Sequence, residues 1–232
     1  MTFDFGLVFE SIPKLLGGLG LTLELLLLSS AIGLVLAVIT LLMRISGRWF
    51  LVAPAVVYIY IFRGTPILVQ IFVIYYGLPQ FEFIREGVLW PFLREPFWCC
   101  ILALSLNAGA YVSEILRGGV LGVDKGILEA ASAVGISKTQ SFIYITSPIA
   151  IRLSLPAYSN DIISMTKATA LASTVTLLDM TGVARTMVAQ TFAPYEIFIS
   201  VAIIYMVMAW MIQKGFSMAE KRMSRYVKRT AG

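Results

Sequence analysis

Five long apolar segments constrain the fold of this chain more than any other feature. They cover Leu15–Met43, Phe50–Phe81, Phe97–Ser113, Leu153–Leu178 and Phe192–Ile212. A helix needs about 20 residues to cross the hydrocarbon core of a bilayer, and each segment can do so, although the third is near the lower limit. Charged residues make up 13% of the chain, against about 25% in soluble domains. We therefore expect an all-α membrane bundle of five transmembrane helices, forming a single domain over residues 1–232.

The distribution of Lys and Arg predicts how these segments are oriented. With five spans the termini lie on opposite sides, and a cytoplasmic C-terminus leaves the fewest cations outside, as the positive-inside rule requires. The cations then outside are Lys14, Arg85, Arg94 and Arg185. Those then inside are Arg44, Arg48, Arg117, Lys125, Lys138, Arg152 and the cations of residues 213–232. This last segment follows a hydrophobic span, so we interpret it as a basic cytoplasmic tail and expect no nucleic-acid binding.

The second apolar segment is too long for one straight crossing, and Gly64 and Pro66 interrupt it. Pro66 removes a helical hydrogen bond and disfavours helical geometry at Thr65. Non-helical backbone at membrane depth persists only where protein or a water-filled cavity receives it. We therefore expect a broken helix that lines a substrate path, with Arg63 directly before the break. The alternative is a hinge between a surface-lying amphipathic stretch and a short span.

The longest segment outside the spans, residues 114–151, is cytoplasmic in this topology. Asp124 can cap a first helix there, and Gly135 can end it at a positive φ. Ser137 can then open a second short helix that stops near Pro148. The apolar stripe of the first helix consists of Ile127, Leu128, Ala131 and Val134. Because such surface usually marks an interaction site, we expect a protein partner; the alternative is packing onto the ends of neighbouring spans.

This loop resembles the EAA motif of the permease subunits of bacterial ABC importers. The matching residues are Glu129, Ala130, Ala131, Gly135, Ile145 and Pro148. Ser147 stands where the family usually has Leu. The resemblance implies that the Glu-Ala-Ala triplet and Gly135 belong to a coupling helix, which docks into a groove on an ATPase subunit.

Three further stretches resemble the polar amino-acid uptake branch of this family. They are Arg63–Gln70, which begins RGTP, Asn107–Gly119 and Leu155–Ser173. The likeness covers nearly the whole chain in order, and it is greatest to the histidine, arginine and opine permeases, on the side of the HisM-like subunit. It implies ATP-driven import of basic amino acids or related opines across the bacterial inner membrane, with the N-terminus periplasmic.

The resemblance also implies a complex of several proteins. Its other members are a second permease subunit, homologous or identical to this one, two ATP-binding subunits and a periplasmic substrate-binding protein. The chain has no GxxxxGK[ST] phosphate-binding loop, so we expect a partner to hydrolyse ATP. We expect no enzyme activity, metal or cofactor in this chain itself.

Asp161 and Lys167 are charges at membrane depth, which mark functional sites by default. Six residues place them about 120° apart on a helix, so they cannot form an i,i+4 pair. An acid suits an amino or guanidinium head. We therefore expect Asp161 to bind substrate, with the structural anchoring of another helix as the alternative. The other candidate substrate-binding residues are Asn160, Asn107 and Thr65. The charges expected to have structural roles are Lys167, Glu114 and Arg63.

A polar stripe marks the third apolar segment, because Asn107, Tyr111 and Glu114 fall at positions i, i+4 and i+7. We expect it to face the protein interior, where hydrogen-bonded helix packing is its usual role. Asn107 is the deepest of the three and the one expected to reach substrate.

Two other classes of function remain open from the residues alone. A secondary transporter or channel could use Asp161 and Lys167 as a proton or ion relay. A membrane enzyme is less well supported, because the chain contains no histidine and so lacks Ser-His, Cys-His and HExxH chemistry. Co-purification with an ATPase subunit would distinguish an importer from both.

Overall fold

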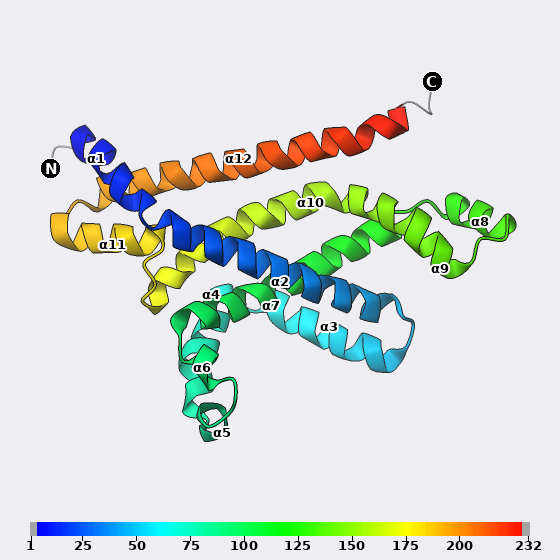
Figure 1. Cartoon of the computed structure of the whole chain (residues 1–232), viewed down its shortest axis with the longest axis horizontal. Coiled ribbons are helices and arrows are strands. Elements are labelled where there is room, and N and C mark those ends of the chain that lie inside the picture. Colours follow the sequence, from blue (N-terminus) through cyan, green and yellow to red (C-terminus); the bar gives the residue numbers. More distant parts are fainter. Residues whose placement is uncertain (1–3, 229–232) are drawn as a thin grey trace.

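The structure is a computed structural model, and it describes residues 4–228, with side chains as far as residue 223. Four long helices dominate it: α2 (Leu19–Ile45), α7 (Pro96–Leu121), α10 (Ser147–Ala168) and α12 (Pro194–Lys228). Residues 4–228 contain no strand. α2 packs along α7, and α10 contacts both α7 and α12 (Figure 1). The all-α class is confirmed.

Within residues 4–228, three helices are long and apolar enough to cross a membrane: Leu19–Ile45, Pro96–Leu121 and Pro194–Met223. A fourth candidate is a bent pair, in which α3 (Trp49–Gly64) and the helical residues 67–80 meet at 107°. α10 has 22 residues but is not among these candidates, and it carries Arg152, Asp161 and Lys167. α10 corresponds to the predicted fourth span. Its assignment as a span depends on its packing against α7 and α12 and not on its hydropathy.

The first apolar segment is divided, contrary to the prediction that Leu15 opens a single span. Leu15 belongs to a separate helix, α1 (Phe5–Leu16), which packs against α12 (Figure 1). The division falls at Gly18, where a Cβ would lie 2.6 Å from the carbonyl carbon of Asp179. This close approach of two distant segments cannot be recognised in the local sequence.

Asp179 lies beside Gly18 and stabilises the contact between these segments, although it was not among the residues expected from the sequence. Its carboxylate is fully buried and caps α11 (Met180–Thr191), accepting hydrogen bonds from the backbone N–H groups of Thr181 (3.2 Å) and Gly182 (3.0 Å). The hydroxyl of Tyr205 lies 3.4 Å from the same carboxylate. Asp179 thereby ties the start of α11 to α12.

The ends of the later segments also differ from the prediction. α7 continues past Ser113 to Leu121, and α12 continues past Ile212 to Lys228. α10 ends at Ala168, before the predicted boundary at Leu178, and a 3₁₀ turn (Thr169–Val175) follows it. Helical backbone continues beyond the apolar runs because polar side chains are favourable outside the hydrocarbon layer, so hydropathy marks the crossing and not the helix end.

Small residues allow α2 and α7 to approach closely. A Cβ at Gly33 would lie 2.6 Å from the Cβ of Ala108, and one at Gly109 would lie 2.8 Å from the Cβ of Leu36. Close by, the hydroxyl of Tyr58 on α3 donates to the carbonyl of Leu106 on α7 at 2.6 Å. Membrane helices commonly pack through such small residues, because lipid offers no hydrophobic gain for association.

A short helical arm leaves the bundle between α3 and α7. It begins with α4 (Ile67–Phe72), a π-helical turn (Val73–Gly77) and a 3₁₀ turn (Leu78–Gln80). It ends with α5 (Glu82–Arg85) and α6 (Trp90–Leu93), which project from the bundle together (Figure 1).

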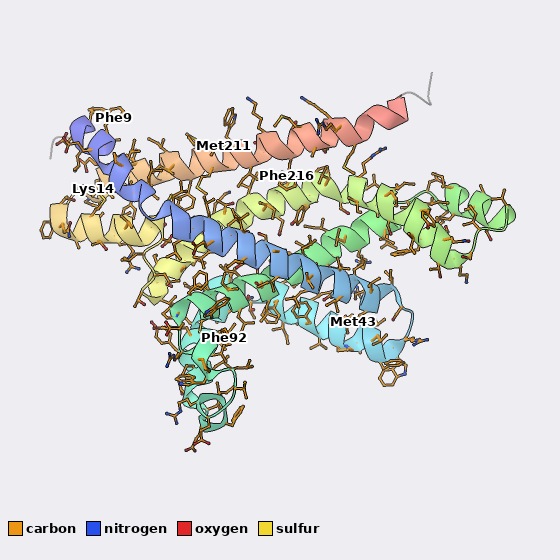
Figure 2. All side chains as sticks on the ribbon, viewed as in Figure 1. Phe9, Lys14, Met43, Phe92, Met211 and Phe216 are labelled. Atoms are coloured by element: carbon orange, nitrogen blue, oxygen red, sulfur yellow. The ribbon has the colours of Figure 1, made fainter. Side chains whose placement is uncertain are left out.

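The segments predicted to be cytoplasmic gather at one end of the bundle. This end holds the α2–α3 turn, the C-terminal end of α12, and the helices α8 (Lys125–Ala133) and α9 (Lys138–Ser141), while α1 and α11 lie at the other end (Figure 1). Lys14 and Met43 accordingly lie near opposite ends (Figure 2). The side of the membrane that each end faces stays a prediction.

The predicted basic tail, residues 213–232, is a continuation of α12 as far as Lys228. The ammonium group of Lys214 lies 4.4 Å from the ring centre of Trp210. Arg229 and the side chains of Arg225 and Lys228 lie outside the described residues.

Candidate functional site

The predicted helix break is present between α3 and α4. Thr65 (φ −115°, ψ 146°) and Pro66 (φ −63°, ψ 133°) are extended, as expected for a proline and the residue before it. The break leaves carbonyl groups at the end of α3 without helical partners. In a membrane these groups need partners from elsewhere in the protein.

Two side-chain amides supply those partners. The Gln70 amide nitrogen donates to the carbonyl oxygens of Phe62 (2.9 Å) and Thr65 (3.0 Å). The Asn107 amide donates to the carbonyl of Phe62 and to the side-chain oxygen of Gln70, both at 3.1 Å. Gln70 was not among the expected site residues. A buried amide four residues after a helix-breaking proline is the sequence feature that could have indicated it.

The break borders a cavity of about 410 Å³. The cavity is lined by Thr65, Pro66, Ile67, Asn107, Tyr111, Asp161, Ser164, Met165 and Ala168. Three of the four candidate substrate-binding residues therefore share one space, although 96 positions separate Thr65 from Asp161 in the chain. The fourth, Asn160, is exposed and does not line it.

Asp161 is the acidic residue of this cavity. Within the described residues its carboxylate forms no hydrogen bond or ion pair, so its oxygen lone pairs are available to a ligand. Lys167 is exposed and lines neither this cavity nor the one beside it. The two charges are not paired, as the helical angle between them predicted.

A second cavity of about 380 Å³ lies beside the first, and Tyr111 lines both. Its charged residues are Arg44, Arg63 and Glu114. Arg117 holds Glu114 with two short contacts, Nε to Oε1 at 2.9 Å and Nη2 to Oε2 at 2.7 Å. Arg44 Nε lies 3.5 Å from Glu114 Oε1, so Glu114 links α2 to α7.

The predicted coupling loop forms the two expected helix starts. The Asp124 carboxylate accepts from the Gly126 N–H at 2.6 Å, and Ser137 forms a capping box with Gln140. Gly135 has φ +81°. The N–H groups of Gly135 and Ile136 bond the carbonyls of Ser132 and Ala131, at 3.1 and 3.0 Å, which is the Schellman arrangement at a helix end.

The second helix of the loop does not stop near Pro148, contrary to the prediction. α9 leads through a π-helical turn (Phe142–Thr146) directly into α10, which begins at Ser147. Pro148 lies where this turn passes into α10, and because proline lacks an N–H group it donates no helical hydrogen bond there. The proline therefore coincides with a change of helix type and not with a helix end.

Comparison with known proteins agrees with this architecture. Residues 29–225 match the family model described as the binding-protein-dependent transport system inner membrane component. The chain belongs to this family. The predicted membership of the ABC importer permeases is therefore confirmed.

Several relatives cover almost the entire permease. It is 47% identical over 220 residues to the octopine transport system permease protein OccM of Rhizobium meliloti, covering 95% of this chain and 90% of that one. It is 43% identical over 230 residues to the nopaline transport system permease protein NocM of Agrobacterium fabrum, covering 99% and 95%. It is 40% identical over 212 residues to the histidine/lysine/arginine/ornithine transport system permease protein HisM of Escherichia coli, covering 91% and 89%.

Solved structures show the same fold. A chain of an amino acid ABC transporter, crystallised with histidines, superposes on the permease with a TM-score of 0.85 at 35% identity, covering 96% of this chain and 100% of that one. A chain of the MetNI methionine ABC transporter in an inward-facing conformation has a TM-score of 0.68 at 16% identity, covering 94% and 97%. The second likeness concerns the fold alone.

Proposed function

We propose that this permease carries basic amino acids or opines inward, and that the cavity at the helix break is its substrate site. Asp161 binds the cationic head of the substrate, while Thr65 and Asn107 offer polar contacts on the facing wall. Relatives named for octopine, nopaline and histidine/lysine/arginine/ornithine transport support this substrate class, because each of these compounds can carry a cationic nitrogen group.

The observation that carries the proposal is the unpaired carboxylate of Asp161 beside a broken helix. Asp161 is half-buried, and an acid withdrawn from water normally has a partner, since desolvation of a charge is costly. Asp161 has none among the described residues, and it lines a 410 Å³ cavity together with Thr65 and Asn107. A cationic ligand would supply the missing partner.

The geometry also argues against the relay alternative. A proton or ion relay requires its charged groups to face a common path. Asp161 faces the cavity, whereas the exposed Lys167 lies on another side of α10. No contact among the described residues connects the two.

The exposed apolar surface of residues 124–146 supports the proposal that this loop docks on an ATP-binding subunit. Its large exposed apolar residues are Ile127 (45%), Val134 (76%), Ile136 (37%), Ile143 (53%) and Tyr144 (75%). Only Ala131 of the predicted stripe is buried. Packing onto the ends of neighbouring spans leaves most of this surface uncovered. ATP is then hydrolysed by the partner, and a second permease subunit and a periplasmic binding protein complete the importer.

Co-purification from native membranes tests this assignment. A tagged chain, extracted in mild detergent, should retain an ATP-binding subunit, and the isolated complex should hydrolyse ATP. Its binding of radiolabelled L-arginine should fall in the Asp161→Asn variant. Recovery of the chain with no ATP-binding protein, together with proton-driven uptake, would contradict the proposal.

A further inference from the structure

The second cavity has an excess of positive charge. Arg44 and Arg63 line it, and Glu114 is its one acid. Arg117 already binds Glu114 through both carboxylate oxygens. Both carboxylate oxygens of Glu114 therefore already have a hydrogen-bonding partner, whereas the guanidinium groups of Arg44 and Arg63 keep unused donors within the described residues.

Arg63 has no carboxylate partner among the described residues. Its guanidinium carbon lies 5.1 Å from the ring centre of Tyr111, a cation–π contact that leaves its N–H groups free to bind an anion. Arg44 Nε is buried and forms no hydrogen bond, being 3.5 Å from Glu114. A guanidinium fork matches a carboxylate with two parallel hydrogen bonds. This cavity therefore has the chemistry of a carboxylate site.

The two neighbouring cavities share Tyr111 and carry opposite charges. Asp161 offers a carboxylate in the first, and Arg63 offers a guanidinium in the second. We propose that they form one zwitterion site, in which Arg63 binds a carboxylate group of the substrate while Asp161 binds its cationic head. Arg63 is then a substrate-binding residue in addition to a membrane charge, and Arg44 adds to the positive potential behind it.

This inference rests on the proposed function and narrows its substrate class. The site accepts compounds that carry both a cationic nitrogen group and at least one carboxylate, such as basic amino acids and their carboxylated conjugates. It discriminates against amines of the same size that lack the carboxylate, because these compounds cannot form the paired hydrogen bonds with the Arg63 guanidinium.

A matched pair of ligands tests the carboxylate contact. L-arginine and agmatine differ only in the carboxylate group, and equilibrium binding of each is measured on the purified permease–ATPase complex without the binding protein. The wild type should bind arginine at least about 10-fold more tightly than agmatine. Arg63→Gln should weaken arginine binding by about 10-fold or more and leave agmatine binding unchanged. Lys167→Gln, on an exposed face outside both cavities, is the control and should change neither.

Two results would overturn the carboxylate contact. One is a wild-type complex that binds agmatine as tightly as arginine. The other is an Arg63→Gln complex that loses affinity for both ligands equally, since that would assign Arg63 to the support of the helix break. If Arg63→Gln does not assemble, Arg63→Lys decides, because it keeps the charge but loses the fork: its preference for arginine must fall, and an unchanged preference contradicts the proposal.

The Asp161→Asn variant separates this inference from the proposed function. It should weaken arginine and agmatine alike, since both carry the cationic groups. If it does so while Arg63→Gln changes no preference, only the carboxylate contact fails. If Asp161→Asn changes neither ligand, the proposed cation site itself fails, whatever Arg63 does.

Discussion

The side-chain amide of Asn107 donates to the side-chain oxygen of Gln70 at 3.1 Å, and both amides donate to the carbonyl oxygen of Phe62. α7 is thereby fastened to the broken end of α3 and to the start of α4. This linkage keeps Thr65 and Pro66 extended along the wall of the cavity that Asp161 faces. Asn107 thereby has the hydrogen-bonding role predicted for the polar stripe of α7, whereas Tyr111 of the same stripe is exposed.

Replacing Gln70 with Leu should loosen this wall. The carbonyl of Thr65 would lose its amide donor in a part-buried site, and the loss of such a hydrogen bond costs about 0.5–1.5 kcal/mol. We expect a lower unfolding temperature of the purified complex and weaker arginine binding. Gln80→Leu is the matched control, because the Gln80 amide bonds only the exposed carbonyl of Tyr76 (3.1 Å). Equal behaviour of the two variants would show that the linkage is dispensable.

Asp161→Asn keeps the size of the side chain and its hydrogen-bonding oxygen but removes the charge. Loss of a charge-assisted contact should lower substrate affinity at the membrane site by about 5- to 150-fold. Assembly with the ATP-binding subunit should be normal, since the coupling loop lies elsewhere in the fold. Low protein levels with lost assembly would instead assign Asp161 to structural anchoring, and unchanged concentration dependence of uptake would exclude both roles.

Gly135→Leu should abolish uptake and uncouple the ATPase from stimulation by the binding protein, while membrane insertion remains normal. A Cβ at Gly135 would meet nothing within 4 Å, so the surrounding atoms leave room for a side chain. The obstacle is the backbone conformation, because φ is +81°. A left-handed conformation costs most residues about 1–2 kcal/mol, and Asn tolerates it. Gly135→Asn should therefore retain much of the activity. If Leu transports as well as Asn does, the turn is not needed for coupling.

Gly118 and Gly119 are neighbours on α7 with opposite expectations. A Cβ at Gly119 would overlap the hydroxyl oxygen of Ser154 and lie 2.5 Å from the carbonyl oxygen of Ala150, whereas one at Gly118 would meet nothing within 4 Å. Gly119→Ala should separate α7 from α10 and destabilise the protein by about 1–3 kcal/mol, the usual effect of overpacking. Gly118→Ala should be tolerated. Thermal unfolding of both variants in detergent checks the pair, and similar transition temperatures would mean that the helices do not meet at Gly119.

The predicted orientation can be tested with single cysteines. Thr139 lies on α9, and Val88, which is 92% exposed, lies in the projecting arm. Cys99 and Cys100 are fully buried, and replacing both with Ala gives a clean background. In intact cells with a permeabilised outer membrane, an impermeant maleimide should label Val88→Cys and leave Thr139→Cys unlabelled until the inner membrane is opened. Labelling in the reverse pattern would invert the topology.

The sequence by itself determined the features that depend on neighbouring residues. Long apolar runs determined the membrane class, because a helix satisfies all its backbone hydrogen bonds within one segment and can therefore cross lipid. Pro66 determined the helix break, since it lacks an N–H group. Asp124, Gly135 and Ser137 determined the ends of the helices in the coupling loop, because caps form between residues only a few positions apart.

Only the tertiary structure decided which distant groups meet. It brought Thr65, Asn107 and Asp161 to one cavity and left Asn160 outside it. It made Gln70 a partner of the broken helix and set Arg63 beside a second cavity. It also divided α1 from α2, since Gly18 lies against a segment about 160 positions away. Such meetings depend on how the helices pack and cross, and the packing is set by contacts spread along entire helix faces, which no short stretch of sequence contains.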